Sequence, residues 1–328
     1  MVKEKMEPFF IIGSQRSGTT LFRLLLNAHS QVAIPEEGTF WMPLLKTKTL
    51  ICSDPLKGTK LKKFLTYLKK NSQLVEWNID HEKILKELFD KKECPLDFLF
   101  SSLYHEFARS TGKLYWGDKT PSFFRKIEQL SKIFPKAKFI HIIRDGRDVY
   151  LSRRKMAGRK NISVAALEWK HKVLKARKSL AKFPPGQSME IRFEDVLVSP
   201  NEILQKVCSF LGLKYEEEML NFWKTSHDFI GTHHSDLIFK PISPSSSGKW
   251  KSKMSEKEIL QFECISGDLL KSLNYEVSSK RVNAFETVKS YLSLIYGFPV
   301  RLFEVFRIAT MLRICALLGL KTNAAGGK

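Results

Sequence analysis

The first readable pattern lies in residues 9–30, FFIIGSQRSGTTLFRLLLNAHS. Four apolar residues predict a short buried strand, and a polar loop rich in Gly, Ser and Thr follows it. Apolar positions then recur at helical spacing, at Leu21, Leu24, Leu25 and Ala28. The pattern predicts a strand, a phosphate-binding loop and a helix.

Strand and helix patterns alternate along the rest of the chain. Further strands are expected at Val32–Ile34 and in KLYWGDK, KAKFIHIIRD and SMEIRFED. Helical periodicity covers residues 55–109, 146–183 with a break near Gly158, SPNEILQKVCSFLGL and residues 255–273. Thr120 and Pro121 are expected to begin another helix, as its N-cap and first residue.

This alternation predicts an α/β fold, a parallel sheet with helices on both faces. In such folds ligands bind beyond the carboxyl ends of the strands. The loops that follow Ile12, Ile34, Gly117, Ile143 and Phe193 are therefore expected to converge.

Composition adds a strong positive charge. The 328 residues are 43% hydrophobic, and 55 Lys and Arg against 34 Asp and Glu give a net charge of +21. Such a field attracts polyanions, anionic membranes or a highly charged cofactor. The five cysteines have no spacing suited to zinc. MVKEKMEP leads straight into the first strand without a signal peptide, so a cytoplasmic location is expected.

The C-terminal segment differs in character, so the expected domains are residues 1–279 and a helical extension, 280–328. Charges at Arg301, Glu304, Arg307 and Arg313 leave no stretch of about 18 uncharged residues, and the tail is not expected to span a membrane. Two roles for the tail stay open. It could pack on the enzyme or on a second copy in a homo-oligomer, or it could make peripheral membrane contact. Packing is favoured because the charged positions wrap around the helix.

The loop after the first strand departs from the nucleotide-binding pattern at one position. Gly13, Gly18 and Thr20 fit G-x-x-x-x-G-K-[ST], but Thr19 stands in the place of the lysine, and Arg16 lies inside the loop. A nucleotide triphosphatase with a degenerate loop, or a loop that only caps a helix, are the alternatives.

The sequence resembles sulfotransferases that use 3′-phosphoadenosine 5′-phosphosulfate (PAPS), in the branch of the tyrosylprotein sulfotransferases and their bacterial relatives. The resemblance covers roughly residues 8–250 and rests on GSQRSGTTL, PEEGT, DKTP and RDGRDVYLS, in that order. It implies a P-loop NTPase-like sulfotransferase fold with the helical tail appended. PAPS carries no triphosphate, so backbone N–H groups and one or two cations suffice, and no metal is expected.

The resemblance implies a role for each matched residue at the donor site. The 5′-phosphosulfate is expected on Arg16, Ser17, Gly18, Thr19 and Thr20. The 3′-phosphate is expected on Arg144 and Ser152, with Lys249 adding a cation and Phe193 packing on adenine. The alternatives are a salt bridge of Arg144 at the strand end and a plain core role for Phe193. His234 and Ser235 lie near a position that supports the sulfuryl group in relatives.

The expected catalytic residues are Glu37, Lys119 and Arg16. Glu37 matches the general base, with Glu36 as the other candidate; a solvated turn is the alternative for both acids. Lys119 and Arg16 are expected to stabilise charge on the transferred group. Lys119 could instead be a surface lysine before a helix.

The expected function is transfer of a sulfuryl group from PAPS to an acceptor hydroxyl, with adenosine 3′,5′-bisphosphate as the product. The acceptor class stays open, and no nucleic-acid partner is expected. A small-molecule kinase would need a loop lysine and a magnesium-binding acid, and neither is evident. A non-catalytic polyanion-binding protein is the alternative that the charge suggests.

Overall fold

The computed structural model describes residues 7–46, 55–154, 161–224, 236–278 and 284–317. They form two compact units, which are described separately. The first unit comprises residues 1–143 and 175–243, and the second comprises residues 144–174 and 244–328. The domain boundary expected near residue 279 stays a prediction.

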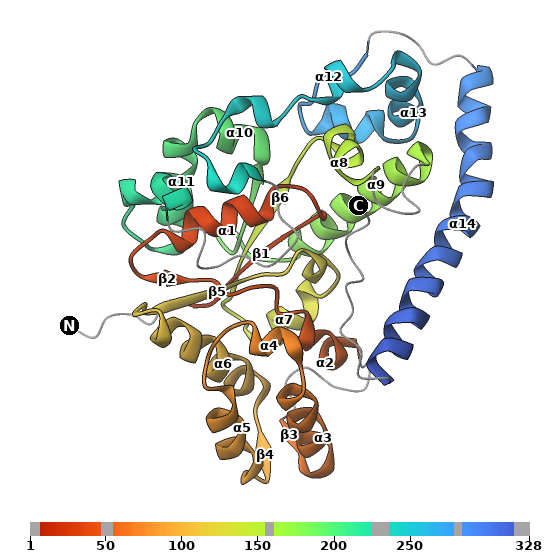
Figure 1. Cartoon of the computed structure of the whole chain (residues 1–328). Helices are drawn as coiled ribbons and strands as arrows, with labels where there is room; N and C mark the ends of the chain where they lie inside the picture. Colours follow the sequence, from red (N-terminus) through yellow and green to blue (C-terminus); the bar gives the residue numbers. More distant parts are fainter. Residues whose placement is uncertain (1–6, 47–54, 155–160, 225–235, 279–283, 318–328) are drawn as a thin grey trace. The chain divides into compact units, whose positions relative to one another are not determined.

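The first unit contains a five-stranded parallel sheet in the order β2-β5-β1-β6-β7 (Figure 1). The strands are β1 (Phe9–Gly13), β2 (Val32–Ala33), β5 (Tyr115–Lys119), β6 (Lys138–Ile143) and β7 (Ser188–Arg192). The sequence patterns predict all five, and the expected parallel sheet is confirmed. The carboxyl ends of these strands lie at one edge, which therefore collects the loops after them.

Helices cover both faces of the sheet, as the alternation along β1 requires. Phe10 and Ile12 join one core cluster, whereas Phe9 and Ile11 join another. The first cluster includes side chains of α3 (Gly58–Lys69), α5 (His81–Phe89), α6 (Leu96–Ser110) and α7 (Ile127–Ile133). The second includes side chains of α1 (Thr19–Asn27), α10 (Phe193–Val198), α11 (Pro200–Leu211) and the 3-10 helix η3 (Glu217–Lys224).

The remaining elements of this unit are short. They are β3 (Leu56–Lys57) and β4 (Glu93–Cys94), which pair antiparallel, α2 (Met42–Lys46), α4 (Ser72–Val75), and the 3-10 helices η1 (Thr39–Trp41), η2 (Pro121–Arg125) and η5 (Asp236–Phe239). Residues 55–109 read as helical in the sequence, so β3 and β4 were missed. Pro121 does begin a helix, but it is a 3-10 helix, and the Thr120 side chain does not cap it.

The second unit is helical. It contains α8 (Gly146–Arg153), the first part of α9 (Ile162–Leu180), η6 (Pro244–Ser246), α12 (Trp250–Lys253), α13 (Glu256–Ser272) and α14 (Ala284–Leu317). Ser255 and Glu258 form a capping box that begins α13 where the sequence predicts it. The break expected near Gly158 lies outside the described residues. Among the described helices, none is both long enough and apolar enough to cross a membrane.

Candidate active site

The loop between β1 and α1 has the backbone geometry of an anion-binding turn. The Ser17 N–H donates to the Ser14 carbonyl at 3.1 Å, and α1 begins immediately after the loop, at Thr19. Arg16 and Gly18 have φ angles of 72° and 86°. A positive φ is uncommon for a residue with a side chain, and such strain concentrates at functional loops. The turn leads the first N–H groups of α1 toward any anion in the loop.

Two glycines of the loop are required by close packing. A β-carbon at Gly13 would lie 2.6 Å from the Ile142 carbonyl oxygen, and one at Gly18 would lie 2.1 Å from Cδ2 of Phe193. Phe193 is only 5% exposed and belongs to the core cluster that also contains Phe9 and Ile11. Its ring therefore supports the loop directly, and its contact with adenine stays a prediction.

The hydroxyl of Ser17 lies in the same loop and fits an anionic ligand. Ser17 is 1% exposed, and its Oγ has no hydrogen-bond partner among the described residues. An unsatisfied buried hydroxyl is unfavourable unless a ligand or water completes it. A phosphate or sulfuryl oxygen would accept this bond, so the loop fits the expected phosphosulfate.

Lys119 and Glu37 form an ion pair at the same edge of the sheet. The distance from Lys119 Nζ to Glu37 Oε1 is 2.7 Å, with the Lys119 side chain fully buried and that of Glu37 38% exposed. The register of β5 on β1 pairs Lys119 with Ile11, two residues before Gly13. A surface role for Lys119 is therefore wrong, because the ammonium group is buried beside a carboxylate that reaches solvent.

The neighbouring acid has a different partner. Glu36 Oε1 lies 2.7 Å from Nη2 of Arg23, which is fully buried on α1. Glu36 thus neutralises a buried guanidinium, whereas Glu37 pairs with the lysine at the end of β5. A solvated turn for the two acids is wrong, and the geometry favours Glu37 as the acid that can meet an acceptor.

A buried hydrogen-bond network holds the loop that contains Glu37 in place. The Gly38 N–H donates to Thr120 Oγ1 at 2.9 Å, the Thr120 hydroxyl donates to Asp118 Oδ2 at 3.1 Å, and the Tyr104 hydroxyl donates to the same oxygen at 2.7 Å. A β-carbon at Gly38 would lie 2.5 Å from the Tyr104 oxygen. The sequence reasoning assigned only Lys119 in DKTP, although Asp118 and Thr120 stand on either side of it.

Burial raises the pKa of two members of this network, Asp118 and Tyr104. Burial raises the pKa of Asp118 from 3.8 to about 6, although hydrogen bonds from Tyr104 and Thr120 oppose the shift. Burial and the adjacent Asp118 carboxylate hold the pKa of Tyr104 well above its usual value. Tyr104 therefore stays protonated and keeps donating to Asp118 at neutral pH.

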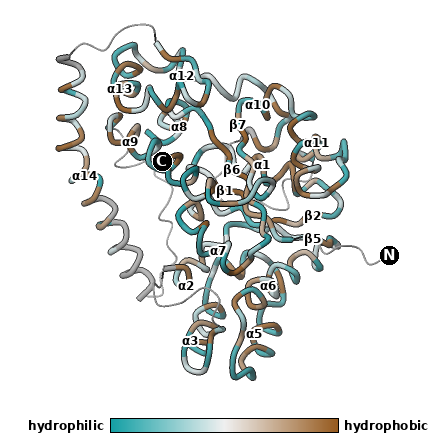
Figure 2. Tube along the Cα trace, turned by 180° about the vertical axis from the view of Figure 1, so that it is seen from behind, coloured by the Kyte–Doolittle hydropathy of each residue, from teal (hydrophilic) through white to brown (hydrophobic). Residues whose placement is uncertain are grey.

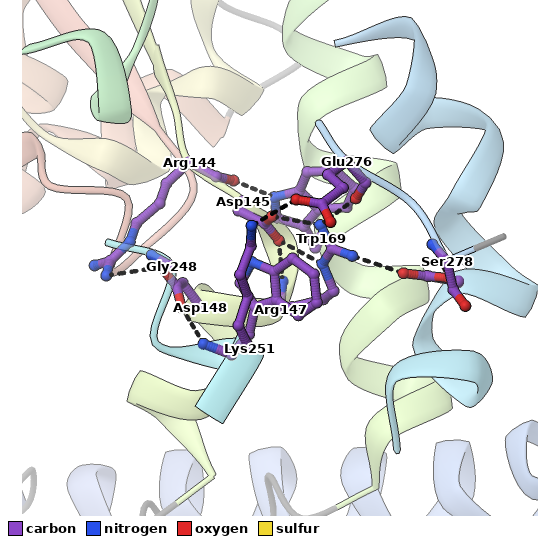
Figure 3. A network of polar contacts seen from close by, with 11 residues as sticks. Arg144, Asp145, Arg147, Asp148, Trp169, Gly248, Lys251, Glu276 and Ser278 are labelled. Carbon is purple, nitrogen blue, oxygen red and sulfur yellow. Dashed lines mark hydrogen bonds and ion pairs between the residues drawn. The ribbon is translucent and has the colours of Figure 1, made fainter. Parts of the chain in front are cut away.

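Arg144 lies in the second unit, directly after β6. Its Nη2 donates to the Ser246 carbonyl at 2.9 Å. The same nitrogen lies 3.5 Å from Oδ2 of Asp148, and both Arg144 and Asp148 are labelled in Figure 3. Asp148 accepts from the N–H groups of Gly248 and Trp250 at 2.8 and 2.9 Å. Asp148 thereby holds the turn that contains Lys249 next to Arg144, so two expected 3′-phosphate ligands come together within this unit.

In the RDGRD motif, the short salt bridges are formed by Arg147 and not by Arg144. Arg147 is fully buried, with Nη2 at 2.7 Å from Asp145 Oδ2 and Nη1 at 2.6 Å from Glu263 Oε1. Its guanidinium carbon also lies 3.4 Å from the ring centroid of Trp250. Arg147 therefore has the structural role that the sequence left open for Arg144, whose contact with Asp148 is long.

Other predicted residues contribute less to the site. Ser152 lies on α8 and is partly exposed, and its role stays a prediction. His234 and Ser235 lie outside the described residues. His141 is a buried residue of β6, with Nδ1 at 3.2 Å from Glu190 Oε2. Within the described ranges, no three His, Cys, Asp or Glu residues are grouped as metal ligands would be.

Comparisons with known proteins identify the family of this chain. Residues 8–217 match the model of the sulfotransferase family. A Caenorhabditis briggsae protein, provisionally named a protein-tyrosine sulfotransferase, is 27% identical over 292 residues, which cover 86% of this chain and 90% of that protein.

Two solved structures have a similar fold. The sulfotransferase domain of the Synechococcus PCC 7002 olefin synthase has a TM-score of 0.58 at 20% identity and covers 85% of this chain and 98% of its own. The sulfotransferase domain of the curacin biosynthetic pathway has a TM-score of 0.53 at 21% identity and covers 83% of this chain and 99% of its own.

Proposed function

Because this chain belongs to the sulfotransferase family, we propose that it transfers a sulfuryl group from PAPS to an acceptor hydroxyl, with Glu37 as the general base. The observation that carries the proposal is the ion pair of Glu37 and buried Lys119, whose Oε1 and Nζ atoms are 2.7 Å apart. This pair lies at the same edge of the sheet as the phosphate loop, which has no lysine. One acid reaches solvent there beside a fixed cation.

Two sets of residues, one in each unit, are proposed as donor ligands. Ser17, Gly18, Thr19 and Thr20, together with Arg16, would hold the 5′-phosphosulfate through backbone N–H groups, hydroxyls and one guanidinium. The orphaned Ser17 hydroxyl supports this assignment. In the second unit, Arg144 donates to the Ser246 carbonyl beside the turn that contains Lys249, and both residues would bind the 3′-phosphate together with Ser152.

When bound, PAPS supplies the sulfuryl group and a phosphate leaving group. Glu37 would accept the proton of the acceptor hydroxyl while the hydroxyl oxygen bonds to sulfur and the sulfur–phosphate oxygen bond breaks. Lys119 and Arg16 would stabilise the negative charge that grows on the oxygens around sulfur and on the leaving phosphate. Lys119 also fixes the position of Glu37, since its ammonium group is buried and already bonded to that carboxylate.

The family assignment argues against the two alternative functions. A kinase would use the loop lysine that Thr19 replaces, and a non-catalytic polyanion binder would not need a buried lysine paired with an acid at the loop. The acceptor stays open. Tyrosine in a peptide is the first class to test, because the Caenorhabditis briggsae relative carries that name. A cytoplasmic location stays a prediction.

The test is a transfer assay with sulfur-labelled PAPS against tyrosine peptides, sugars, lipids and phenols. We expect label on a hydroxyl of one class, together with release of adenosine 3′,5′-bisphosphate. Transfer of the terminal phosphate from labelled ATP, with none from PAPS, would overturn the proposal in favour of a kinase.

A further inference from the structure

The long helix α14 packs on its own unit through small and polar residues. Ser290 is 1% exposed, and a β-carbon at Gly297 would lie 2.2 Å from Asn161 Nδ2. Asn161 Nδ2 donates to the Ser293 carbonyl at 3.0 Å, and Arg301 Nε donates to Glu168 Oε1 at 3.0 Å. These contacts recur every three or four residues, so they define one face of the helix.

The other faces of α14 are apolar and open to solvent. Its exposed large side chains, between 48% and 75% accessible, are Val288, Tyr291, Leu292, Ile295, Tyr296, Phe298, Val300, Leu302, Phe303 and Phe306. Figure 2 shows hydrophobic residues along the described part of the helix. Residues 288–306 span about 27 Å along an α-helix. An apolar surface of this length marks an interaction site, because monomeric proteins rarely expose one.

This arrangement reverses the usual one, in which the apolar face of a helix packs on the protein. The sequence argument considered only the charged positions and found no distinct face. The small residues Ser290, Ser293 and Gly297 supply the missing signal, since they mark the side that packs. The spacing of the charged residues did not reveal the exposed apolar side chains of the described part of α14.

We propose that the apolar face of α14 lies in the surface of an anionic lipid bilayer and holds the protein there as a peripheral membrane enzyme. Lys289 and Arg307 are exposed, and both stand about 160° around the helix from Tyr291. They border the apolar face where basic side chains can reach anionic headgroups. Tyrosine, of which α14 exposes two, is enriched at the level of the headgroups.

Charge favours lipid over a second copy of the chain. A pair of these helices would bring together two molecules that each carry a net charge of +21. Like charges at an interface repel. In contrast, each basic residue near the surface of a membrane that contains phosphatidylserine contributes about 1 kcal/mol to the free energy of membrane binding. The proposal does not depend on the donor or acceptor of the transfer reaction.

The test uses the full chain and a variant with Ile295→Ser, Phe298→Ser and Leu302→Ser. The wild type should sediment with vesicles of phosphatidylcholine and phosphatidylserine and much less with phosphatidylcholine alone. The variant should lose at least tenfold in vesicle affinity. Val75→Ser with Val198→Ser is the matched control, because both valines are also exposed, at 57% and 70%, but lie in the first unit.

Unfolding curves of the variant and the control check that both fold, and sedimentation velocity reports the oligomeric state. Two results overturn the proposal. One is a wild type that does not bind anionic vesicles. The other is vesicle binding that survives the triple substitution while a dimer dissociates, which would assign the apolar face to a second copy.

Discussion

At the scale of single residues, adjacent acids with the same chemistry have different roles because their partners differ. Glu36 lies against a buried arginine, and Glu37 lies against a buried lysine at the end of β5. No sequence pattern predicts those partners, since Arg23 is 13 residues from Glu36 and Lys119 is 82 residues from Glu37. The choice between the two acids therefore depends on structure, whereas the motif itself is readable in the sequence.

Glu37→Gln should abolish most turnover and leave binding of adenosine 3′,5′-bisphosphate nearly unchanged. The amide keeps the size of the side chain but cannot accept the proton, and loss of a general base typically costs about 10²- to 10⁴-fold in rate. Steady-state kinetics and calorimetric titration would measure the two effects.

Glu36→Gln is the contrasting variant. It should lower the midpoint of thermal unfolding, because Arg23 loses its charged partner, while the folded variant keeps most of its turnover. Full activity in Glu37→Gln together with lost turnover in Glu36→Gln would reverse the assignment of the base.

Asp118 makes a prediction about pH. Its pKa is about 6 in the folded protein against a usual 3.8, so between these values the folded state keeps a proton that the unfolded state has lost. Asp118 therefore lowers the stability as pH rises from about 4 to 6, by about 2 kcal/mol. Asp118→Asn removes this loss.

Urea unfolding of wild type and Asp118→Asn at pH 4 and pH 7 would measure the effect. The free energy of unfolding of the variant, relative to wild type, should rise by about 2 kcal/mol between the two pH values. Parallel pH profiles would show that the carboxyl of Asp118 ionises normally in the fold.

At the scale of elements, the periodic parts of the sequence predicted the structure well. All five parallel strands lie where the sequence predicts strands, and α13 begins next to its expected start at residue 255. The two-residue strands β3 and β4 were missed because they lie within residues 55–109, where helical periodicity dominates the sequence. Thr120 was expected to cap a helix, but its hydroxyl instead joins Asp118 and Gly38, a tertiary contact that local pattern cannot reveal.

Arg147 forms buried ion pairs with Asp145 and Glu263 in the second unit. Replacing it with methionine should lower the free energy of unfolding by about 3 to 5 kcal/mol, because Asp145 and Glu263 would stay buried without their cation. Lys251→Met is the matched control, since Lys251 and Glu276 are both exposed and such pairs contribute at most about 1 kcal/mol. Equal denaturant midpoints for the two variants would show that the buried network is not needed for stability.

At the scale of the whole molecule, the expected donor ligands fall in two compact units. The phosphate loop, Glu37 and Lys119 belong to the first, and Arg144, Ser152 and Lys249 belong to the second. All of these proposed ligands except Lys249 lie in the four motifs, which could be read in the sequence because each motif is local. The support behind them could not be predicted, since Phe193 against Gly18 and Asp148 against Gly248 are contacts between residues distant in sequence.

The most direct test of the account is calorimetric titration of the protein with adenosine 3′,5′-bisphosphate, AMP and ATP. Two or more charge-assisted hydrogen bonds to the 3′-phosphate should make the bisphosphate at least about 100-fold tighter than AMP. Arg144→Ala should remove most of that preference and leave the weaker affinity for AMP unchanged. Equal affinities for the bisphosphate and AMP, or tightest binding of ATP, would contradict the proposed donor.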